Sequence, residues 1–228
     1  DGDGKPVVQA TEVMDVAVAV PHDRSLDVGG KLPVVIYSHG TGGSFDGFAK
    51  GGSLSPAEML TKQGLVVVGI NQPIHGTRSG KDLDKSVLQL ASFNYLNPDS
   101  GRSVFRQAAL DNVFLVEMIK AGKLNVPANA VSGNKEIVLD PNRMLFMGHS
   151  QGGVVGVLLA TVEARIRAYM FSGAGGGLSL TAVMRKDIVN FPELIENTLS
   201  LEKGELSEFH PAISLIQLLV DITDPLSY

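Results

Sequence analysis

One serine of this chain stands in the sequence context that nucleophilic catalysis requires. Ser150 is the centre of residues 148–152, Gly-His-Ser-Gln-Gly, which match the pattern G-x-S-x-G. A serine hydroxyl attacks a carbonyl carbon only if a base takes its proton and its oxygen is held out towards the substrate. The glycines at both ends permit a turn too tight for side chains, so the pattern predicts Ser150 as the nucleophile of an acyl-transfer reaction.

The segments around Ser150 supply the elements between which such a turn must lie. Residues 144–147 are apolar and predict a strand, and residues 154–160 are mostly apolar and predict a helix. In a chain with 26 glycines the five-residue pattern alone is weak, because a glycine-rich turn inside an ordinary core would look the same. The two flanks together favour the strand, turn and helix of a nucleophile elbow.

A second glycine-rich turn predicts the groups that would stabilise a transition state. Residues 32–38 are apolar and β-branched, as in a strand buried on both faces, and His-Gly-Thr-Gly-Gly follows at 39–43. Acyl transfer builds negative charge on the carbonyl oxygen, and backbone N–H groups aimed at that oxygen lower the barrier. We expect one N–H from Gln151 and the other from Thr41, with Gly42 as the alternative donor.

Together these motifs resemble those of the α/β-hydrolase superfamily over residues 11–175. The segments that carry the resemblance are 39–43, 71–76 (Asn-Gln-Pro-Ile-His-Gly), 140–143 (Asp-Pro-Asn-Arg) and 148–153. Residues 93–108, which begin Phe-Asn-Tyr-Leu-Asn-Pro-Asp, are similar to bacterial lipases and esterases of the virulence-factor lipase type, which include outer-membrane lysophospholipases. The resemblance implies an α/β-hydrolase fold, a small-molecule or lipid ester substrate, and an exported protein.

The alternation of strands and helices along the chain predicts an α/β fold with a mostly parallel sheet covered by helices on both faces. Strands are expected at 13–20, 34–38, 65–70, 144–147 and 165–171, and helices from Ser55 to Gly64 and at 103–121. We expect residues 1–177 to form the front part of an α/β-hydrolase core. Residues 178–228, with helices at 191–201 and 211–223, are expected to form a helical cap; for the second helix alone, an ordinary core helix is the alternative.

The catalytic acid and base are harder to place. The superfamily order is Ser, then Asp or Glu, then His, yet four of the five histidines precede or adjoin Ser150. Only His210 follows it, at the start of a predicted helix rather than after a strand, which makes it a less favoured base. The three later aspartates lie in or beside helical segments. We therefore expect the acid, the base and the last part of the core to lie beyond Tyr228.

Three residues beside these motifs are candidates for contact with a substrate: Gly40, His75 and His149. Gly40 would let the main chain come close to the bound molecule. His75 follows an apolar strand, at the end of the strand where site residues gather, although a loop-fixing role is the alternative. For His39 we favour a role in orienting its loop over a role in catalysis.

Composition narrows the classes of partner. A net charge of −5 gives no basic surface for nucleic acid, and the absence of cysteine excludes a disulfide, a thiol nucleophile and a cysteine-based metal site. No apolar run approaches the roughly 20 residues of a membrane span, although association with a membrane surface stays open, as does the oligomeric state. No segment matches a nucleotide-binding fingerprint, so we expect neither a metal nor another cofactor.

These observations predict a serine carboxylic-ester hydrolase, of esterase or lipase type, that forms an acyl-enzyme on Ser150. The same machinery would also serve an amidase, a thioesterase or an acyltransferase, and the sequence does not separate them. A third alternative is a hydrolase-like fragment that binds acyl ligands without turnover, because no acid and base are identified.

Overall fold

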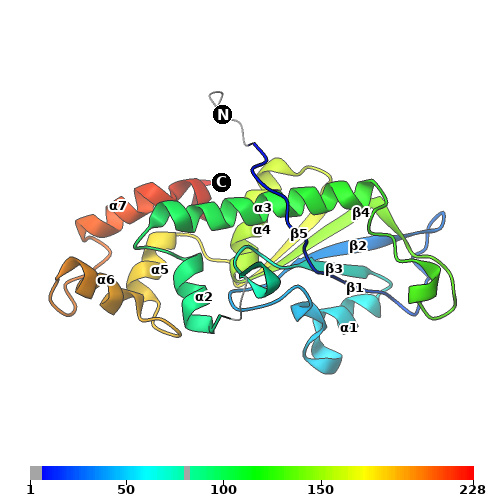
Figure 1. Cartoon of the computed structure of the whole chain (residues 1–228), viewed down its shortest axis with the longest axis horizontal. Helices are drawn as coiled ribbons and strands as arrows, with labels where there is room; N and C mark the ends of the chain where they lie inside the picture. The colour runs from blue at the N-terminus through cyan, green and yellow to red at the C-terminus, as the bar shows by residue number, and fades with distance from the viewer. Residues whose placement is uncertain (1–6, 80–82) are drawn as a thin grey trace.

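The chain forms a five-stranded sheet with helices on both of its faces. The computed structural model describes residues 7–79 and 83–228. The strands lie in the order β1-β3-β2-β4-β5 (Figure 1). Their bounds are β1 Val16–Ala19, β2 Lys31–Ser38, β3 Val66–Ile70, β4 Val138–His149 and β5 Ile166–Ser172. β1 is antiparallel to β3 and every other pair of neighbours is parallel, so the predicted α/β fold with a mostly parallel sheet is confirmed.

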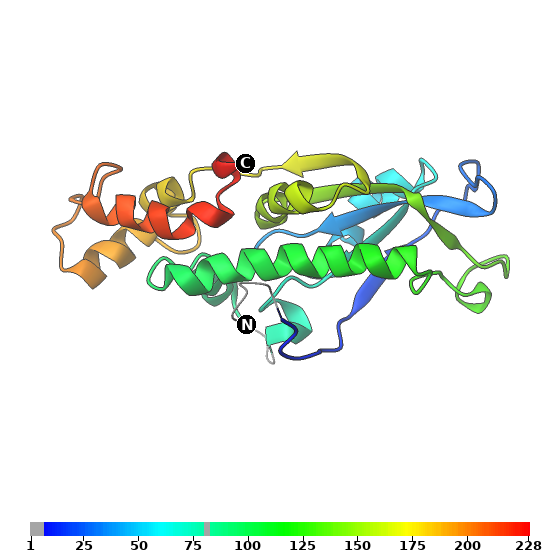
Figure 2. The ribbon, with the colours of Figure 1, turned by 90° about the horizontal axis from the view of Figure 1, so that it is seen from above.

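The helices that pack on the sheet lie on both of its faces. The α-helices are α1 Pro56–Thr61, α2 Lys85–Ser92, α3 Pro98–Lys120, α4 Gln151–Val162, α5 Leu178–Met184, α6 Phe191–Leu199 and α7 Pro211–Val220. Short 3-10 helices lie at Gly47–Ala49, Gly52–Leu54, Gly76–Ser79, Ala128–Ala130, Asp221–Thr223 and Pro225–Ser227. α1 covers one face, and α3 and α4 lie side by side on the other (Figures 1 and 2). Right-handed crossovers explain this division. The step from β2 to β3 goes towards the β1 edge of the sheet, whereas the steps from β3 to β4 and from β4 to β5 go towards the opposite edge, so their helices lie on opposite faces.

The central strand β2 shows why the sequence is apolar where it is. Successive side chains of a strand point to opposite faces of the sheet. Val34 and Ile36 belong to the core beneath α3 and α4. Tyr37 turns to the other face, where its ring centroid lies 5.7 Å from that of Phe48. Both faces of β2 are therefore buried, as its sequence predicted.

Two helix starts show how caps set the boundaries. The side chain of Ser55 accepts an N–H of the first turn of α1, and Pro56 takes the first helical position, so the helix starts where it was predicted to start. Asn97 caps α3 in the same way, so this helix begins at Pro98 rather than at 103. The prediction overlooked this Asn-Pro start. It also missed α2 and α5, which have only 8 and 7 residues.

Two strands differ in length from their predictions. β4 extends well before the predicted 144–147, because its pairing with β2 shifts register once and then continues. Arg143 spans this irregularity through an ion pair with Asp140 at 2.7 Å. β1 is shorter than predicted and covers only four residues of 13–20.

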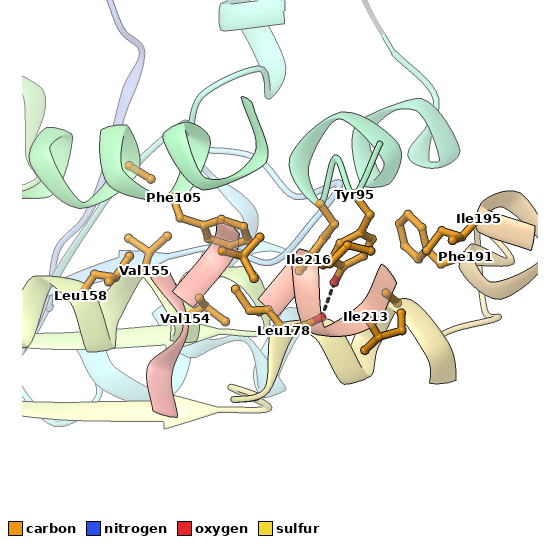
Figure 3. Close-up of a cluster of buried hydrophobic side chains, with 14 of the residues drawn as sticks. Tyr95, Phe105, Val154, Val155, Leu158, Leu178, Phe191, Ile195, Ile213 and Ile216 are labelled. Carbon is orange, nitrogen blue, oxygen red and sulfur yellow. Dashed lines mark hydrogen bonds between the residues drawn. The ribbon is translucent and has the colours of Figure 1, made fainter. Parts of the chain in front are cut away.

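The last three helices form a layer beside the sheet. α5 packs against α6 and α7, and α7 packs against α3 (Figure 1). Their shared core is apolar and aromatic: the ring of Tyr95 meets that of Phe191 edge-on at 5.0 Å, and the Tyr95 hydroxyl donates to the carbonyl oxygen of Leu178 at 2.8 Å (Figure 3). The outer side of α7 leaves Leu215 and Leu218 exposed. α7 thus buries only one side, although its sequence is apolar nearly throughout.

The strand order decides where a site can form. From β2 the chain moves to β3 on one side, and later it enters β4 on the other side of β2. In a parallel sheet the connections on either side of such a reversal diverge and leave a crevice at the carboxyl ends of the strands. The turn after β2 (residues 39–43) and the turn after β4 (residues 148–152) lie at this reversal.

Candidate active site

The turn after β4 holds Ser150 in a strained backbone conformation. Its φ of 51° and ψ of −117° form a combination that residues with a side chain rarely adopt. The Ser150 N–H donates to the carbonyl oxygen of Ser172 at 2.8 Å, which ties the turn to the end of β5. This is the strand, strained turn and helix that the sequence predicted.

Glycines make the turn possible through contacts that leave no room for a side chain. A Cβ atom on Gly148 would lie 2.3 Å from the carbonyl oxygen of Gly152, and one on Gly152 would lie 2.1 Å from that of Ser38. α4 therefore begins directly against the end of β2. A Cβ on Gly40 would lie 3.0 Å from the Cβ of Ser150, so the bare main chain of Gly40 faces the serine.

The hydroxyl of Ser150 and two N–H groups beside it have no protein partner. Across residues 7–79 and 83–228, no group hydrogen-bonds to Oγ of Ser150, which is half-buried. Gln151 is the first residue of α4, where an N–H has no acceptor within the helix. Neither its N–H nor that of Thr41 finds an acceptor in the described part of the chain. Both N–H groups are therefore free of a protein acceptor in the described residues.

The alternative donor, Gly42, is already engaged. Its N–H donates to Nε2 of His75 at 3.1 Å, and Nδ1 of the same ring lies 2.9 Å from the carbonyl oxygen of Pro73. Nδ1 therefore carries the proton, and the ring is fully buried. Two expectations are corrected: the Gly42 N–H is not free for an oxyanion, and His75 is not placed to touch a substrate. Its loop-fixing alternative fits these contacts.

His39 ties the turn after β2 to the turn after β3. Its Nε2 accepts the N–H of Gln72 at 3.1 Å, and its Nδ1 donates to the carbonyl oxygen of Gly40 at 2.8 Å. Burial lowers the pKa of His39 to about 4, against the opposing effect of its bond to Gly40. Burial likewise lowers the pKa of His75, whose ring centroid lies 5.0 Å from that of His39. Both rings are neutral acceptors for loop N–H groups, in line with the loop-orienting role expected of His39.

Gln72 lies beneath the site, and its role was missed in the sequence. Its Nε2 donates to the carbonyl oxygen of His39 and, at 3.2 Å, to Oγ of Ser38. Its Oε1 accepts from Nε2 of Gln151 at 2.9 Å, and Oε1 of Gln151 accepts from the hydroxyl of Thr41 at 2.8 Å. The available signal was a polar residue almost directly after β3, a strand that is buried throughout.

The remaining histidines do not supply a base to Ser150. His149 is exposed beside the serine, with its ring against Gly40. His210 caps α7, with Nδ1 accepting the N–H of Ala212 at 3.2 Å, and α7 begins at the end of the helical layer remote from the sheet (Figures 1 and 2). The structure therefore does not bring His210 to Ser150. Contact of the exposed His149 with a substrate stays a prediction.

Asp224 is the one buried carboxylate among the three later aspartates, and it is fully occupied. It accepts the N–H groups of Gly177 at 2.8 Å and Leu178 at 2.6 Å, and it also accepts from Gln217 and Leu226. Burial alone would raise the pKa of Asp224, but the hydrogen bonds from its four partners outweigh burial and hold this pKa below its usual range. In the described residues, no carboxylate contacts a histidine.

The described residues hold neither a metal cluster nor a membrane-spanning helix. Within the two described stretches, no group of three or more histidine, aspartate or glutamate side chains could hold a metal ion. The same stretches contain no helix long and apolar enough to cross a bilayer. The side chains around Ser150 that hold one another are amides, hydroxyls and neutral imidazoles.

Comparison with known proteins addresses the fold. No family model matches the sequence, and no curated protein is similar to it in sequence. Among solved structures, an acetyl xylan esterase from Paenibacillus sp. R4 is similar with a TM-score of 0.59 and 14% identity over 94% of this chain. An acylaminoacyl peptidase from Pyrococcus horikoshii is similar with a TM-score of 0.51 and 13% identity, also over 94% of this chain. The chain has the α/β-hydrolase fold.

The lengths of the two similar structures are informative as well. The match covers 60% of the length of the esterase chain and 27% of the length of the peptidase chain. At these identities the likeness concerns the fold, which is the one expected from the residues around Ser150.

Proposed function

We propose that this chain carries the nucleophile and the oxyanion site of a serine carboxylic-ester hydrolase. One observation supports the proposal above all others: Ser150 is held at φ 51° with a free hydroxyl, next to the unpartnered N–H groups of Gln151 and Thr41. A folded chain keeps such strain and such unpaired donors at a cost, and both are common where chemistry is performed.

In the proposed reaction, Oγ of Ser150 attacks the ester carbonyl carbon while a base removes the hydroxyl proton. The carbonyl electron pair moves to oxygen, and the N–H groups of Gln151 and Thr41 stabilise that oxyanion. The pair returns, the bond to the alcohol oxygen breaks, and the alcohol leaves with the proton held by the base. Water then hydrolyses the acyl-enzyme by the same steps.

The base and its acid are proposed to come from sequence beyond Tyr228. In support, no imidazole of the described residues hydrogen-bonds to Ser150, and His39 and His75 already use both ring nitrogens on the main chain. His210 serves as the cap of a helix that begins away from the site.

An acyl or lipid ester is the proposed substrate class. The exposed His149 and the bare main chain of Gly40 would line its path to Ser150. The layer of α5 to α7, which packs against α3, would act as a cap. The similarity of residues 93–108 to virulence-factor lipases supports the same class, as does the ester named for the similar acetyl xylan esterase. Amide hydrolysis, named for the similar peptidase, is the alternative that a panel of esters, amides and thioesters separates.

Labelling with a fluorophosphonate tests the proposal directly. Intact-mass spectrometry should show one adduct, peptide mapping should place it on Ser150, and Ser150→Ala should abolish both labelling and hydrolysis of 4-nitrophenyl acetate. The intact mass, compared with 24.1 kDa for these 228 residues, also reveals whether the protein continues past Tyr228. Hydrolysis that survives in Ser150→Ala would refute the proposal.

A further inference from the structure

We infer that Gln72 is a positioning residue that fixes the two oxyanion donors relative to each other through the side chains of Gln151 and Thr41. The inference rests on the function proposed above. Gln72 is 2% exposed and follows β3, whereas the two donors follow β4 and β2. It therefore lies behind the donors, without touching a substrate.

The direction of the hydrogen bonds is fixed from one end. The carbonyl oxygen of His39 can only accept, so Gln72 must present Nε2 to it and turn Oε1 the other way. That Oε1 accepts Nε2 of Gln151 at 2.9 Å, which leaves Oε1 of Gln151 to accept the hydroxyl of Thr41 at 2.8 Å. Each amide thus has a single satisfied orientation, and the order of donors and acceptors cannot be reversed.

This fixed order links three separate turns of the sheet. The residues at its far end, Gln151 and Thr41, are the two whose main-chain N–H groups are unpartnered. Oxyanion stabilisation depends on donors that are already in place before charge develops. When the amide of Gln72 is lost, both N–H groups remain, but the Gln151 amide loses the partner that fixes its orientation towards the Thr41 hydroxyl. A loss of rate is therefore expected with both donors still present.

Gln72→Met is the informative change, because methionine keeps the length of the side chain but provides none of these hydrogen bonds. Gln89→Met is its matched control: Gln89 is also fully buried, and it bonds the Val189 N–H at 2.7 Å from α2. We expect the second-order rate of fluorophosphonate labelling at Ser150 to fall about tenfold or more in Gln72→Met, below the 10²–10³ lost with an oxyanion donor itself. Gln89→Met should label within about twofold of the wild type, because the Gln89 side chain bonds Val189 and takes no part in the hydrogen bonds of Gln72.

A double-mutant cycle separates positioning from general damage. If Gln72 acts through Gln151, adding Gln72→Met to Gln151→Met should slow labelling by less than about twofold more. Effects that multiply in full would overturn the inference. So would labelling of Gln72→Met at the wild-type rate, while the proposed function would stand. Failure of the wild type to label at Ser150 would instead refute the proposed function.

Hydrogen exchange measures the same linkage without turnover. Peptides covering residues 39–45 should exchange faster in Gln72→Met than in Gln89→Met, because the turn loses the Gln72 bond to the His39 carbonyl oxygen and the Gln151 amide that holds Thr41 is no longer fixed. Equal exchange in the two variants would overturn the inference whatever the labelling rates.

Discussion

Nε2 of His75 accepts the N–H of Gly42 at 3.1 Å, and only a neutral imidazole can do so. His39 holds the N–H of Gln72 in the same way. Protonation would turn each Nε2 into a donor facing another donor, so each hydrogen bond would be lost. The turn that carries Thr41 therefore depends on two imidazoles that stay uncharged.

Acidification should destabilise the fold in a defined pH window. The pKa of His39 is lowered from 6.5 to about 4 in the folded chain, and that of His75 is lowered too. Between pH 6.5 and 4 the unfolded chain thus binds more protons than the folded one, so stability falls as pH falls and levels off for His39 below about 4. The His39 shift corresponds to roughly 3 kcal/mol of unfolding free energy, measurable by urea denaturation from pH 8 to pH 4.

A His39→Gln variant checks the source of this dependence. It should be less stable than the wild type at pH 8, and it should lose less stability between pH 6.5 and 4. His22→Gln, at an exposed position, should keep the wild-type profile. A His39→Gln profile as steep as that of the wild type would contradict the assignment.

Gly152→Ala should be severely destabilising, by about 3 kcal/mol or more, because the new methyl group would lie 2.1 Å from the carbonyl oxygen of Ser38. The methyl group would clash with main-chain atoms of Ser38 and His39, and no flexible side chain could move to make room for it. Gly175→Ala is the control, since a methyl group there would have no neighbour within 4 Å and the backbone is not left-handed. Thermal unfolding of the two variants should differ widely, and similar midpoints would speak against the close contact of α4 with β2.

The free energy of unfolding of Ser150→Gly should exceed that of Ser150→Ala by about 1 kcal/mol. Glycine relieves the strain at φ 51° and ψ −117°, and this gain exceeds the added flexibility of the unfolded chain. Chemical denaturation of the two inactive variants makes the comparison independent of catalysis. A more stable alanine variant would show that the turn is not strained.

Asp224→Asn should cost about 2 kcal/mol or more, because the amide nitrogen would face N–H groups that now bond a carboxylate. Asp221→Asn, three residues earlier and exposed, should change stability by less than about 0.5 kcal/mol. Urea unfolding at pH 7 measures both. Equal effects would mean that the buried bonds from Gly177 and Leu178 contribute little.

The sequence predicted best where local chemistry leaves few options. The elbow at Ser150 follows from glycines that must lack side chains and from apolar segments on either side, and both were visible. The α/β fold followed from the alternation of strands and helices. The start of α3 was missed because the residues after its Asn97 cap are mostly polar and show no apolar periodicity.

What the sequence could not supply was the use of individual hydrogen bonds between distant turns. Thr41 was the preferred donor and Gly42 the alternative, but only the position of His75, 33 residues later, shows that the Gly42 N–H is taken. Gln72 and Gln151 are 79 residues apart, and nothing near either one announces the other. Such pairings depend on strand order and register, which are set by the whole sheet rather than by any segment.

The contact of Gly152 with the end of β2 has a mechanical consequence. No flexible side chain stands between the carbonyl oxygen of Ser38 and the first turn of α4, so the joint has nothing that can be compressed or rotated. A slow deformation of the sheet would then move Ser150 and the turn with Thr41 together, as one rigid body. The relative position of these two turns would then be set by direct contact between their main chains, even when the rest of the molecule moves.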